Sequence, residues 1–392
     1  MGNLNRLLKM GMVGGGPGAF IGDVHRRAAC LDGGVELVAG AFSSMGRRSR
    51  RKGRELGLDP SRVYGSYETM LESELMRPEG ERIDFVSIVT PNHLHFPIAD
   101  AFLSAGVHVI CDKPMTLNVI EARKLKQKVK KSKCVFALTH NYTGYPMVKL
   151  ARDMIRSGRL GRIRKVEARY SQGWLATPLE RNGNRQAKWR TTPHFSGNGG
   201  CVGDIGTHAE NLVEYLIGQR ITHLCADLTV FVARRRLDDD GVILVRFQDG
   251  ARGVFSVSQV SVGEENGLSF SIYGERQGLE WRQEQPNSLR VLSLSGPVEI
   301  WTRGGDGVAS ISPAASRATR LPAGHPEGFL EAFANIYVNA CDTIRARIQG
   351  RQPDSLELDF PSVDDGLRGM LFVETALKST RATQKWTRFP QR

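Results

Sequence analysis

The sequence predicts an α/β protein in two parts: a doubly wound parallel sheet over residues 1–142, and an α+β domain with a large open sheet over residues 143–392. Two observations predict this division. In the first part, short apolar runs alternate with segments of helical character, which is the pattern of βα units. In the second part, strand-like runs follow one another with only turns between them, which is typical of a mostly antiparallel sheet. The final helices are able to pack back on the first domain.

The expected elements of the first domain alternate along the chain and end at glycine, proline or polar residues. In order, we expect strand 8–13, helix 23–31, strand 35–42, helix 48–56, short strand 63–64, helix 67–75, strand 83–89, helix 97–105, strand 107–111, helix 119–131 and strand 135–139. Parallel sheets bind their ligands at the carboxyl ends of the strands. Those ends carry Gly14, Ser43, Thr90, Asn92, Lys113 and Asn141.

The expected elements of the second domain begin with helix 147–157, strand 163–170 and a loop over 171–200. They continue with helix 204–217, strands 221–232, 241–247, 253–260, 268–273 and 278–282, further strands within 289–302, a loop over 310–323, and helices 326–349 and 364–379. One face of such an open sheet needs a cover, which a second copy of the chain could supply. We therefore expect a homodimer or homotetramer formed through this sheet.

Composition and cysteine usage predict a globular protein without metal or disulfides. The chain has 392 residues, of which 40% are hydrophobic and 24% charged. No apolar run approaches the ~20 residues of a membrane span, and the N-terminus leads into the first strand without room for a signal peptide. We expect a cytoplasmic protein with no membrane partner. The six cysteines are scattered without a C-x-x-C pair, which argues against a disulfide framework and a zinc site.

The net charge of +13 comes from basic runs over 47–54 and 124–133. Both runs fall where we expect exposed helix faces, so a solvated face is the simplest interpretation. No helix-turn-helix, zinc finger or RNA-binding motif accompanies them, and we expect no nucleic acid partner. Attraction of an anionic dinucleotide or an acidic substrate explains the charge with fewer assumptions.

A glycine cluster follows the first strand and predicts a dinucleotide site. Gly14 can make the tight turn, Gly16 lets backbone N–H groups approach a pyrophosphate, and Ala19 stands where a third glycine usually packs helix against strand. An ordinary glycine-rich turn is the alternative. The place of the cluster, at the opening strand of a long alternating chain, favours the cofactor.

The end of the second strand leaves the coenzyme open between NAD and NADP. An NAD enzyme usually carries Asp or Glu about 20 residues beyond the glycine turn, where it holds the ribose 2′-hydroxyl. Here Ser43 and Ser44 end the strand, and no acidic residue occurs between Glu36 and Glu55. Arg47 and Arg48 follow, and small hydroxyls with arginines suit a 2′-phosphate. Alternatively, the arginines point to water.

Lys113 and the segment Gly199–His208 carry the candidate catalytic groups. Lys113 follows a strand and is fixed by Pro114, so it could hydrogen-bond a substrate oxygen that loses its proton; a solvated loop lysine is an equal alternative. Asp204 and His208 are four residues apart and share one face of a helix. An Asp beside a His suits a general base, whereas the alternative is a capping Asp with a surface His.

The chain resembles the family of glucose–fructose oxidoreductase, inositol dehydrogenase and the rhizopine catabolism protein (Gfo/Idh/MocA). The stretches that carry the resemblance are the glycine turn at 14–19, Thr90-Pro91-Asn92-His93-Leu94-His95, Cys111-Asp112-Lys113-Pro114, Asn141-Tyr142, Trp189-Arg190, Gly200–His208 and His325-Pro326-Glu327-Gly328-Phe329. They run over nearly the whole chain. One departure is Asp112, where the family usually has Glu.

The resemblance implies a Rossmann domain, an open-sheet domain and oxidation of a sugar or polyol with NAD(P). It implies that Lys113, Asp204 and His208 form the catalytic group. The coenzyme contacts that it implies are Gly14, Gly16, Pro17, Gly18, Ala19, Phe20, Ile21, Ser43, Ser44, Arg48, Thr90, Pro91, Asn92, His95, Asp112, Lys113, Asn141, Trp189 and Arg190. The substrate is expected at Lys113, Tyr142, Trp174, Arg190, Asp204, His208 and His325.

The resulting hypothesis is an NAD(P)-dependent dehydrogenase of a secondary hydroxyl on a sugar, glycoside or inositol. His208 accepts the hydroxyl proton, Lys113 stabilises the developing alkoxide and Asp204 orients His208. One alternative is a redox-assisted glycosidase, in which a tightly held NAD is regenerated in each cycle. The other is a regulator that binds the dinucleotide without catalysis, and the joint presence of Lys113 and His208 counts against it.

Overall fold

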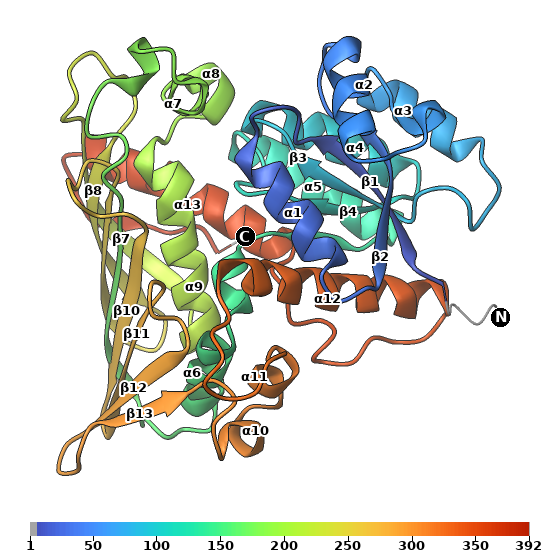
Figure 1. Ribbon diagram of the computed structural model, residues 1–392. Coiled ribbons are helices and arrows are strands. Elements are labelled where there is room, and N and C mark those ends of the chain that lie inside the picture. Colours follow the sequence, from blue (N-terminus) through green and yellow to red (C-terminus); the bar gives the residue numbers. More distant parts are fainter. Residues whose placement is uncertain (1–5, 392) are drawn as a thin grey trace. The chain divides into compact units, whose positions relative to one another are not determined.

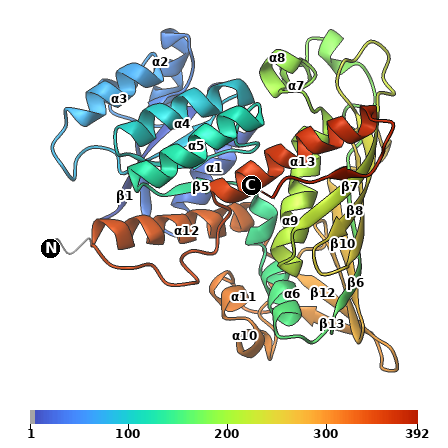
Figure 2. The same cartoon turned by 180° about the vertical axis from the view of Figure 1, so that it is seen from behind.

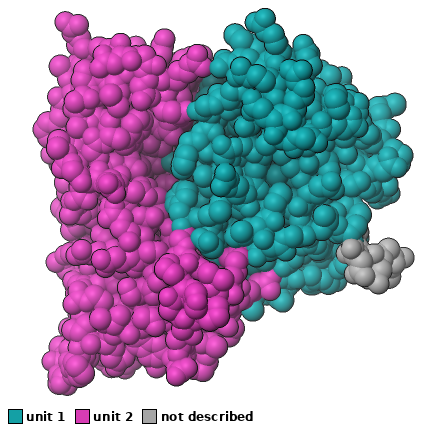
Figure 3. All heavy atoms as spheres, viewed as in Figure 1, with its two compact units in different colours: residues 1–116, 120–141, 329–366 teal, residues 117–119, 142–328, 367–392 magenta. Residues whose placement is uncertain are grey.

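The computed structural model describes residues 6–391 and divides into two compact units, which Figure 3 colours separately. Unit 1 contains the chain up to Thr116, residues 120–141 and residues 329–366. Unit 2 contains residues 117–119, 142–328 and 367 onwards. No helix within residues 6–391 is both long enough and apolar enough to cross a membrane.

Unit 1 is built on a five-stranded parallel sheet in the order β2-β1-β3-β4-β5 (Figure 1). The strands are β1 (Leu8–Gly14), β2 (Val35–Ala41), β3 (Phe85–Val89), β4 (His108–Cys111) and β5 (Phe136–Leu138). The helices are α1 (Phe20–Cys30), α2 (Gly46–Glu55), α3 (Tyr67–Leu75), α4 (His95–Ser104), α5 (Val119–Ser132) and α12 (Phe329–Ile348). This sheet confirms the predicted doubly wound architecture.

The core of unit 1 joins the central strands to α12. Every residue of β3 is buried, as its mostly apolar sequence predicts. Phe333, Tyr337 and Ile344 of α12 lie in the same buried cluster as Leu8, Met10 and Phe85. A helix from near the end of the chain therefore packs with α1 against the first strand.

Unit 2 is built on a nine-stranded sheet in the order β13-β12-β11-β10-β6-β9-β8-β7-β14. Its strands are β6 (Ile163–Ser171), β7 (Ile221–Thr229), β8 (Asp240–Phe247), β9 (Arg252–Ser258), β10 (Gly267–Gly274), β11 (Gln277–Arg282), β12 (Ser288–Ser293), β13 (Glu299–Thr302) and β14 (Thr387–Arg388). Only the β6–β9 pair is parallel among the pairings of this sheet within residues 6–391. The prediction of a mostly antiparallel sheet is confirmed.

Three long helices lie along one face of this sheet: α6 (Pro146–Arg156), α9 (Thr207–Ile217) and α13 (Val363–Arg381) (Figures 1 and 2). Phe372 of α13 packs against Phe255 of β9, with ring centroids 5.9 Å apart. The Ser379 hydroxyl accepts a hydrogen bond of 3.0 Å from the backbone N–H of Ala226 in β7. These contacts fix α13 over the sheet.

Three local expectations are wrong, and each has a physical cause. The segment 310–323 is a loop only beyond residue 317, because Ser312 caps a short helix, α11 (Pro313–Arg317), which follows α10 (Val308–Ile311). The segment 171–200 contains α7 (Arg185–Arg190), capped by Asn184, and α8 (Pro193–Ser196). The helix expected from residue 204 begins as a wider π-helical turn over Val202–Gly206.

Candidate active site

The carboxyl ends of the five strands of unit 1 carry many of the predicted coenzyme residues. The strands run parallel, so these ends share one edge of the sheet. Across the edge, from β2 to β5, lie Ser43 with Ser44, Gly14, Thr90 with Asn92, Asp112 with Lys113, and Asn141. The structure therefore brings together residues from five separate segments of the sequence.

Close backbone approaches shape the turn between β1 and α1. A Cβ atom at Gly14, whose φ is +94°, would lie 2.6 Å from the carbonyl oxygen of Val89. A Cβ atom at Gly16 would lie 2.4 Å from the carbonyl oxygen of Phe42. No side chain caps α1, which begins after Ala19. The glycine cradle and the uncapped N–H groups fit the pyrophosphate of a dinucleotide. Pro17 and Gly18 belong to this turn, and Phe20 and Ile21 are the first residues of α1.

Asp112 and Lys113 follow β4 directly. The Asp112 Oδ1 atom accepts hydrogen bonds from the Lys113 backbone N–H at 2.9 Å and from the Thr139 hydroxyl at 3.0 Å. The His25 Nε2 atom lies 3.8 Å from the same oxygen. Burial raises the pKa of Asp112, but His25 and Lys113 outweigh burial and bring the pKa to about 2. The shorter acid at this position is thus an ionised carboxylate next to the predicted catalytic lysine.

Two buried histidines, His95 and His140, lie close to this edge of the sheet. The His95 Nδ1 atom lies 2.7 Å from the carbonyl oxygen of Pro114, and its Nε2 atom lies 2.9 Å from that of Thr90. His95 therefore ties the turn after β3 to the turn after β4, and its direct contact with coenzyme stays a prediction. Burial, helped by the charge of Lys113, lowers the pKa of His140 to about 3, so this ring is neutral at pH 7.

The predicted ribose site lies in the turn from β2 to α2. The Ser43 hydroxyl accepts a hydrogen bond of 3.2 Å from the backbone N–H of Met45. Ser43 and Arg48 are half-buried and Ser44 is exposed. These side chains remain candidates for the 2′-position of the ribose.

Asp204 and His208 lie in unit 2, where the π-helical turn runs into α9. Asp238 fixes the start of this segment, because its two carboxylate oxygens accept hydrogen bonds of 2.7 Å from the backbone N–H groups of Gly200 and Val202. His208 is buried, and its ring meets Tyr142 edge-on with centroids 4.8 Å apart. The imidazole orientation is therefore fixed by packing.

The predicted loop residues converge on Asp204. The Arg190 Nε atom lies 3.3 Å from Asp204 Oδ2. The Arg190 guanidinium lies 4.1 Å from the centre of the Trp189 ring and 5.7 Å from that of Trp174. Its Nη1 atom also donates a hydrogen bond of 2.7 Å to the Gln186 side chain. The structure thus brings Arg190 to Asp204 and both tryptophans to Arg190. That these loop residues contact a ligand stays a prediction.

Sequence reasoning missed four polar residues next to Asp204 and Tyr142: Tyr170, Gln172, Gln259 and Asn266. Gln259 donates a hydrogen bond of 2.8 Å to Asp204 Oδ2. Gln172 follows β6, Gln259 follows β9 and Asn266 precedes β10. The sequence indicates these residues only by their polar character at the ends of strands. That signal becomes informative once the order of the strands in the sheet is known.

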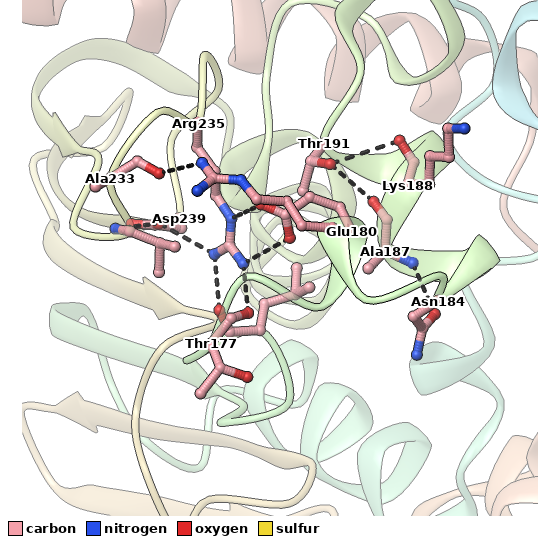
Figure 4. Close-up of polar contacts among 12 residues, drawn as sticks. Thr177, Glu180, Asn184, Ala187, Lys188, Thr191, Ala233, Arg235 and Asp239 are labelled. Atoms are coloured by element: carbon pink, nitrogen blue, oxygen red, sulfur yellow. Dashed lines mark hydrogen bonds and ion pairs between the residues drawn. The ribbon is translucent and has the colours of Figure 1, made fainter.

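A buried arginine anchors the loop that carries Trp174 and Arg190 (Figure 4). Arg235, from the β7–β8 connection, donates to the carbonyl oxygens of Leu175 at 2.7 Å and Thr177 at 2.8 Å. It also binds Glu180 through Nε at 3.2 Å and Nη2 at 3.1 Å, and Asp239 through Nη1 at 3.2 Å. Asn184 then starts α7, which carries Arg190, so the loop has a defined course.

The segment around His325 is held in place by Glu327. Glu327 forms a buried ion pair of 2.9 Å with Arg303 and accepts hydrogen bonds from the backbone N–H groups of Arg320 and Leu321. Arg303 also donates to the carbonyl oxygen of His325. The His325 side chain is exposed, and its role toward the substrate stays a prediction. Within residues 6–391, no group of three or more His, Cys, Asp or Glu side chains is placed to hold a metal ion.

Comparison with known proteins identifies the family. Residues 8–140 match the sequence model of an oxidoreductase family with an NAD-binding Rossmann fold, and residues 148–280 match that of the GFO/IDH/MocA C-terminal domain. The chain belongs to the Gfo/Idh/MocA family. This membership confirms the resemblance noted in the sequence. It makes the chain an oxidoreductase of an NAD-binding family and unit 1 an NAD-binding Rossmann domain.

Three Gfo/Idh/MocA relatives align over nearly their full length. An oxidoreductase from Sinorhizobium meliloti is 44% identical, with a TM-score of 0.87 over 97% of this chain and 99% of that one. An inositol dehydrogenase homolog from Azotobacter vinelandii, solved with NADH and myo-inositol, is 35% identical, with a TM-score of 0.90 over 98% of each chain. Levoglucosan dehydrogenase from Pseudarthrobacter phenanthrenivorans is 27% identical over 416 residues, which cover 98% of each sequence.

Proposed function

We propose that this Gfo/Idh/MocA protein is a dehydrogenase that oxidises a secondary hydroxyl of a sugar, glycoside or inositol with NAD(P). The proposal rests on the chemistry of the side chains near Asp204 and His208 in unit 2. They are the phenols of Tyr142 and Tyr170, the amides of Gln172, Gln259 and Asn266, and the indoles of Trp174 and Trp189. Neutral hydrogen-bonding groups match hydroxyls, and aromatic rings stack on the apolar faces of sugars. Relatives named for inositol and levoglucosan support the same substrate class.

Each catalytic residue has one task in this proposal. His208, buried and held edge-on against Tyr142, accepts the hydroxyl proton. Asp204 orients His208 and stabilises its ring once protonated. Lys113, at the carboxyl end of β4, donates a hydrogen bond to the oxygen that becomes the carbonyl. Bound NAD(P)⁺ supplies the acceptor for the hydride that leaves the carbinol carbon.

The coenzyme side of the proposal rests on unit 1. Gly14, Gly16 and the start of α1 would hold the pyrophosphate. Asp112 would keep the Lys113 turn in place, because its ionised carboxylate accepts the Lys113 backbone N–H. Trp174, Trp189 and Arg190 would line the substrate side, with Arg190 held by Asp204.

An absorbance assay of reduced nicotinamide tests this function. Purified protein is mixed with NAD⁺ or NADP⁺ and a panel of hexoses, glucosides, disaccharides, sugar acids and inositols. We expect turnover with one of these classes, and Lys113→Ala and His208→Ala should each reduce kcat by about a hundredfold or more. Both variants should keep the circular dichroism and unfolding temperature of the parent.

Lys126→Ala and His223→Ala serve as matched controls, because Lys126 pairs with Asp364 in unit 1 and His223 lies on β7 of unit 2. Both controls should keep full turnover. Near-full activity in Lys113→Ala or His208→Ala would remove the role given to that residue. Release of an aglycone without net NADH would instead establish the redox-assisted glycosidase, and dinucleotide binding without any reaction would establish the regulator.

A further inference from the structure

Three amide side chains stand in one row at the edge of the unit 2 sheet. Ser171 of β6 pairs with Ser258 of β9 and with Gly267 of β10. Gln172, Gln259 and Asn266 are each one residue beyond this register row. The sheet therefore places the three amides side by side, next to Trp174 and Asp204.

The indole of Trp174 determines how the first amides are oriented. An indole N–H can only donate, and Trp174 Nε1 lies 3.1 Å from Gln172 Oε1. The Gln172 nitrogen must then face Asn266, and it donates a hydrogen bond of 2.9 Å to Asn266 Oδ1. Gln259 can approach Gln172 Oε1 only with its own nitrogen, which lies 3.3 Å away. The orientation of Gln259 thus follows from a group that cannot accept a hydrogen bond.

At the Asn266 end of the row, Asn266, Tyr170 and Tyr142 form a closed ring of hydrogen bonds. The Tyr170 hydroxyl donates to Asn266 Oδ1 at 2.8 Å, and Asn266 Nδ2 donates to the Tyr142 hydroxyl at 3.2 Å. The two phenol oxygens are 2.5 Å apart, so Tyr142 supplies the hydrogen of that bond. Burial raises the pKa of both phenols, which keeps both hydrogens in place. Turning the Asn266 amide around would place its Nδ2 against two donors, the Tyr170 hydroxyl and Gln172 Nε2, and would break this ring.

At the other end of the row, Gln259 contacts Asp204. The Gln259 nitrogen uses one hydrogen toward Gln172 and the other toward Asp204 Oδ2, at 2.8 Å. The Arg190 Nε atom lies 3.3 Å from the same oxygen. Both groups are donors, and neither can accept a hydrogen from a protonated carboxyl. Hydrogen bonds to the charged form favour that form.

We propose that Gln259 is a positioning residue that holds Asp204 as an ionised carboxylate in one orientation, four residues before His208. The inference rests on the proposed function, because the task matters only if Asp204 and His208 act on the substrate. Gln172 and Trp174 contribute because they exclude the orientation of the Gln259 amide in which its oxygen would face Gln172. Asp204 then supports the imidazolium of His208 and does not itself carry the substrate proton.

The test replaces the donor by a near-isosteric acceptor, Gln259→Glu. Two carboxylates at this distance repel each other, so Asp204 should take up a proton at higher pH. The readout is the infrared band of the protonated Asp204 carboxyl in the protein without substrate, assigned by its loss in an added Asp204→Asn substitution. We expect the midpoint to rise by at least one pH unit. An unchanged midpoint in folded Gln259→Glu overturns the proposal.

Two further variants keep the test decisive. Gln259→Leu removes the donor without adding charge, and it should raise the midpoint of Asp204 protonation by a smaller amount. This variant tests the proposal even if Gln259→Glu does not fold. Gln283→Glu is the matched control, because Gln283 donates to the Tyr145 hydroxyl at 3.2 Å, outside the row. The control should leave the midpoint where it is in the parent. A shift of equal size in Gln283→Glu would assign the effect to general charge and overturn the proposal.

Activity supplies the second readout. The acid limb of the pH profile of kcat/KM should move upward in Gln259→Glu by the same amount as the infrared midpoint. A purely structural role would lower the unfolding temperature and leave the profile in place. The infrared measurement needs no substrate, so failure of the proposed dehydrogenase reaction and failure of the Gln259 proposal are separate outcomes.

Discussion

Two aspartates with opposite pKa shifts show how neighbouring groups decide the effect of burial on the pKa of a carboxyl. In Asp112, burial raises the pKa, but His25 and Lys113 carry it down to about 2. In Asp238, burial is only partly offset by the backbone N–H groups of Val202 and Gly200, and the pKa rises to about 6. Asp112 is therefore charged at every physiological pH, whereas Asp238 titrates within reach of experiment.

Asp238→Asn should change how stability depends on pH. The folded-state pKa of Asp238 exceeds its ordinary value of 3.8, so the folded protein binds this proton more tightly than the unfolded chain does. The stabilisation is complete below about pH 4 and is lost as the pH rises through about 6, a change of ~3 kcal/mol. Asp238→Asn removes this slope. Urea unfolding at a series of pH values measures it, and parallel curves for the two proteins would contradict the prediction.

Ser43→Asp should shift the coenzyme preference toward NAD. The side chain lies in the turn after β2, where an acidic residue would hydrogen-bond a ribose 2′-hydroxyl and repel a 2′-phosphate. We expect the ratio of kcat/KM for NADP⁺ to that for NAD⁺ to fall about tenfold or more. Ser61→Asp is the control, because Ser61 is exposed in a turn elsewhere in unit 1. An unchanged ratio would mean that Ser43 does not face the ribose.

At the scale of elements, ion pairs of Arg235 hold the loop between β6 and α9 in place. Glu180, whose side chain is 13% exposed, and the buried Asp239 both pair with Arg235, whose side chain is 2% exposed. The same arginine also satisfies two loop carbonyls. A segment with little hydrophobic core of its own thereby reaches a single conformation, which brings Trp174 and Arg190 to Asp204.

Arg235→Met should destabilise the protein by about 3–5 kcal/mol, because it leaves the buried Asp239 carboxylate and the half-buried Glu180 carboxylate without their partner. The free energy of unfolding in urea measures this loss, and KM should rise more than kcat falls. Arg169→Met is the matched control. Arg169 also pairs with a glutamate, Glu264, but its side chain is 56% exposed, so its loss should cost about 0–1 kcal/mol. Equal losses in the two variants would refute the anchoring role of Arg235.

At the scale of the whole molecule, the exposed apolar residues on one face of the unit 2 sheet set the expected assembly. The long helices α6, α9 and α13 lie on the other face (Figures 1 and 2). On β8, Val242 and Leu244 are 44% and 41% exposed. Leu244 pairs with Cys225 on β7 and Val254 on β9, which makes a row of apolar residues across three strands. We propose that a second copy covers this row.

Leu244→Lys should therefore dissociate the protein. Sedimentation velocity should show an oligomer for the parent and a 43.3 kDa monomer for the variant. A charge in the centre of an apolar interface loses its hydration without a partner, which weakens association. Thermal unfolding at low protein concentration checks that the monomer stays folded. Identical sedimentation of both proteins would place the interface elsewhere.

Local sequence patterns determined much of this protein. Mostly apolar runs predicted β3 and its neighbouring strands. The alternation of strands with helices predicted the parallel sheet, and glycines placed at a strand end predicted the dinucleotide turn. These features depend on residues close together in the chain, so sequence alone carries them. The short helices α7 and α11 were missed because a single capping residue, Asn184 or Ser312, starts each one.

Only the tertiary structure decided how the groups around Asp204 are arranged. Gln172 and Gln259 are neighbours because β6 and β9 pair in parallel, although 87 positions separate them. Asn266 joins them through the antiparallel pairing of β10 with β6. Likewise, α12 contributes Tyr337 to a core built by the first strand. Strand register and helix docking are set by packing between distant segments, and no local pattern records them.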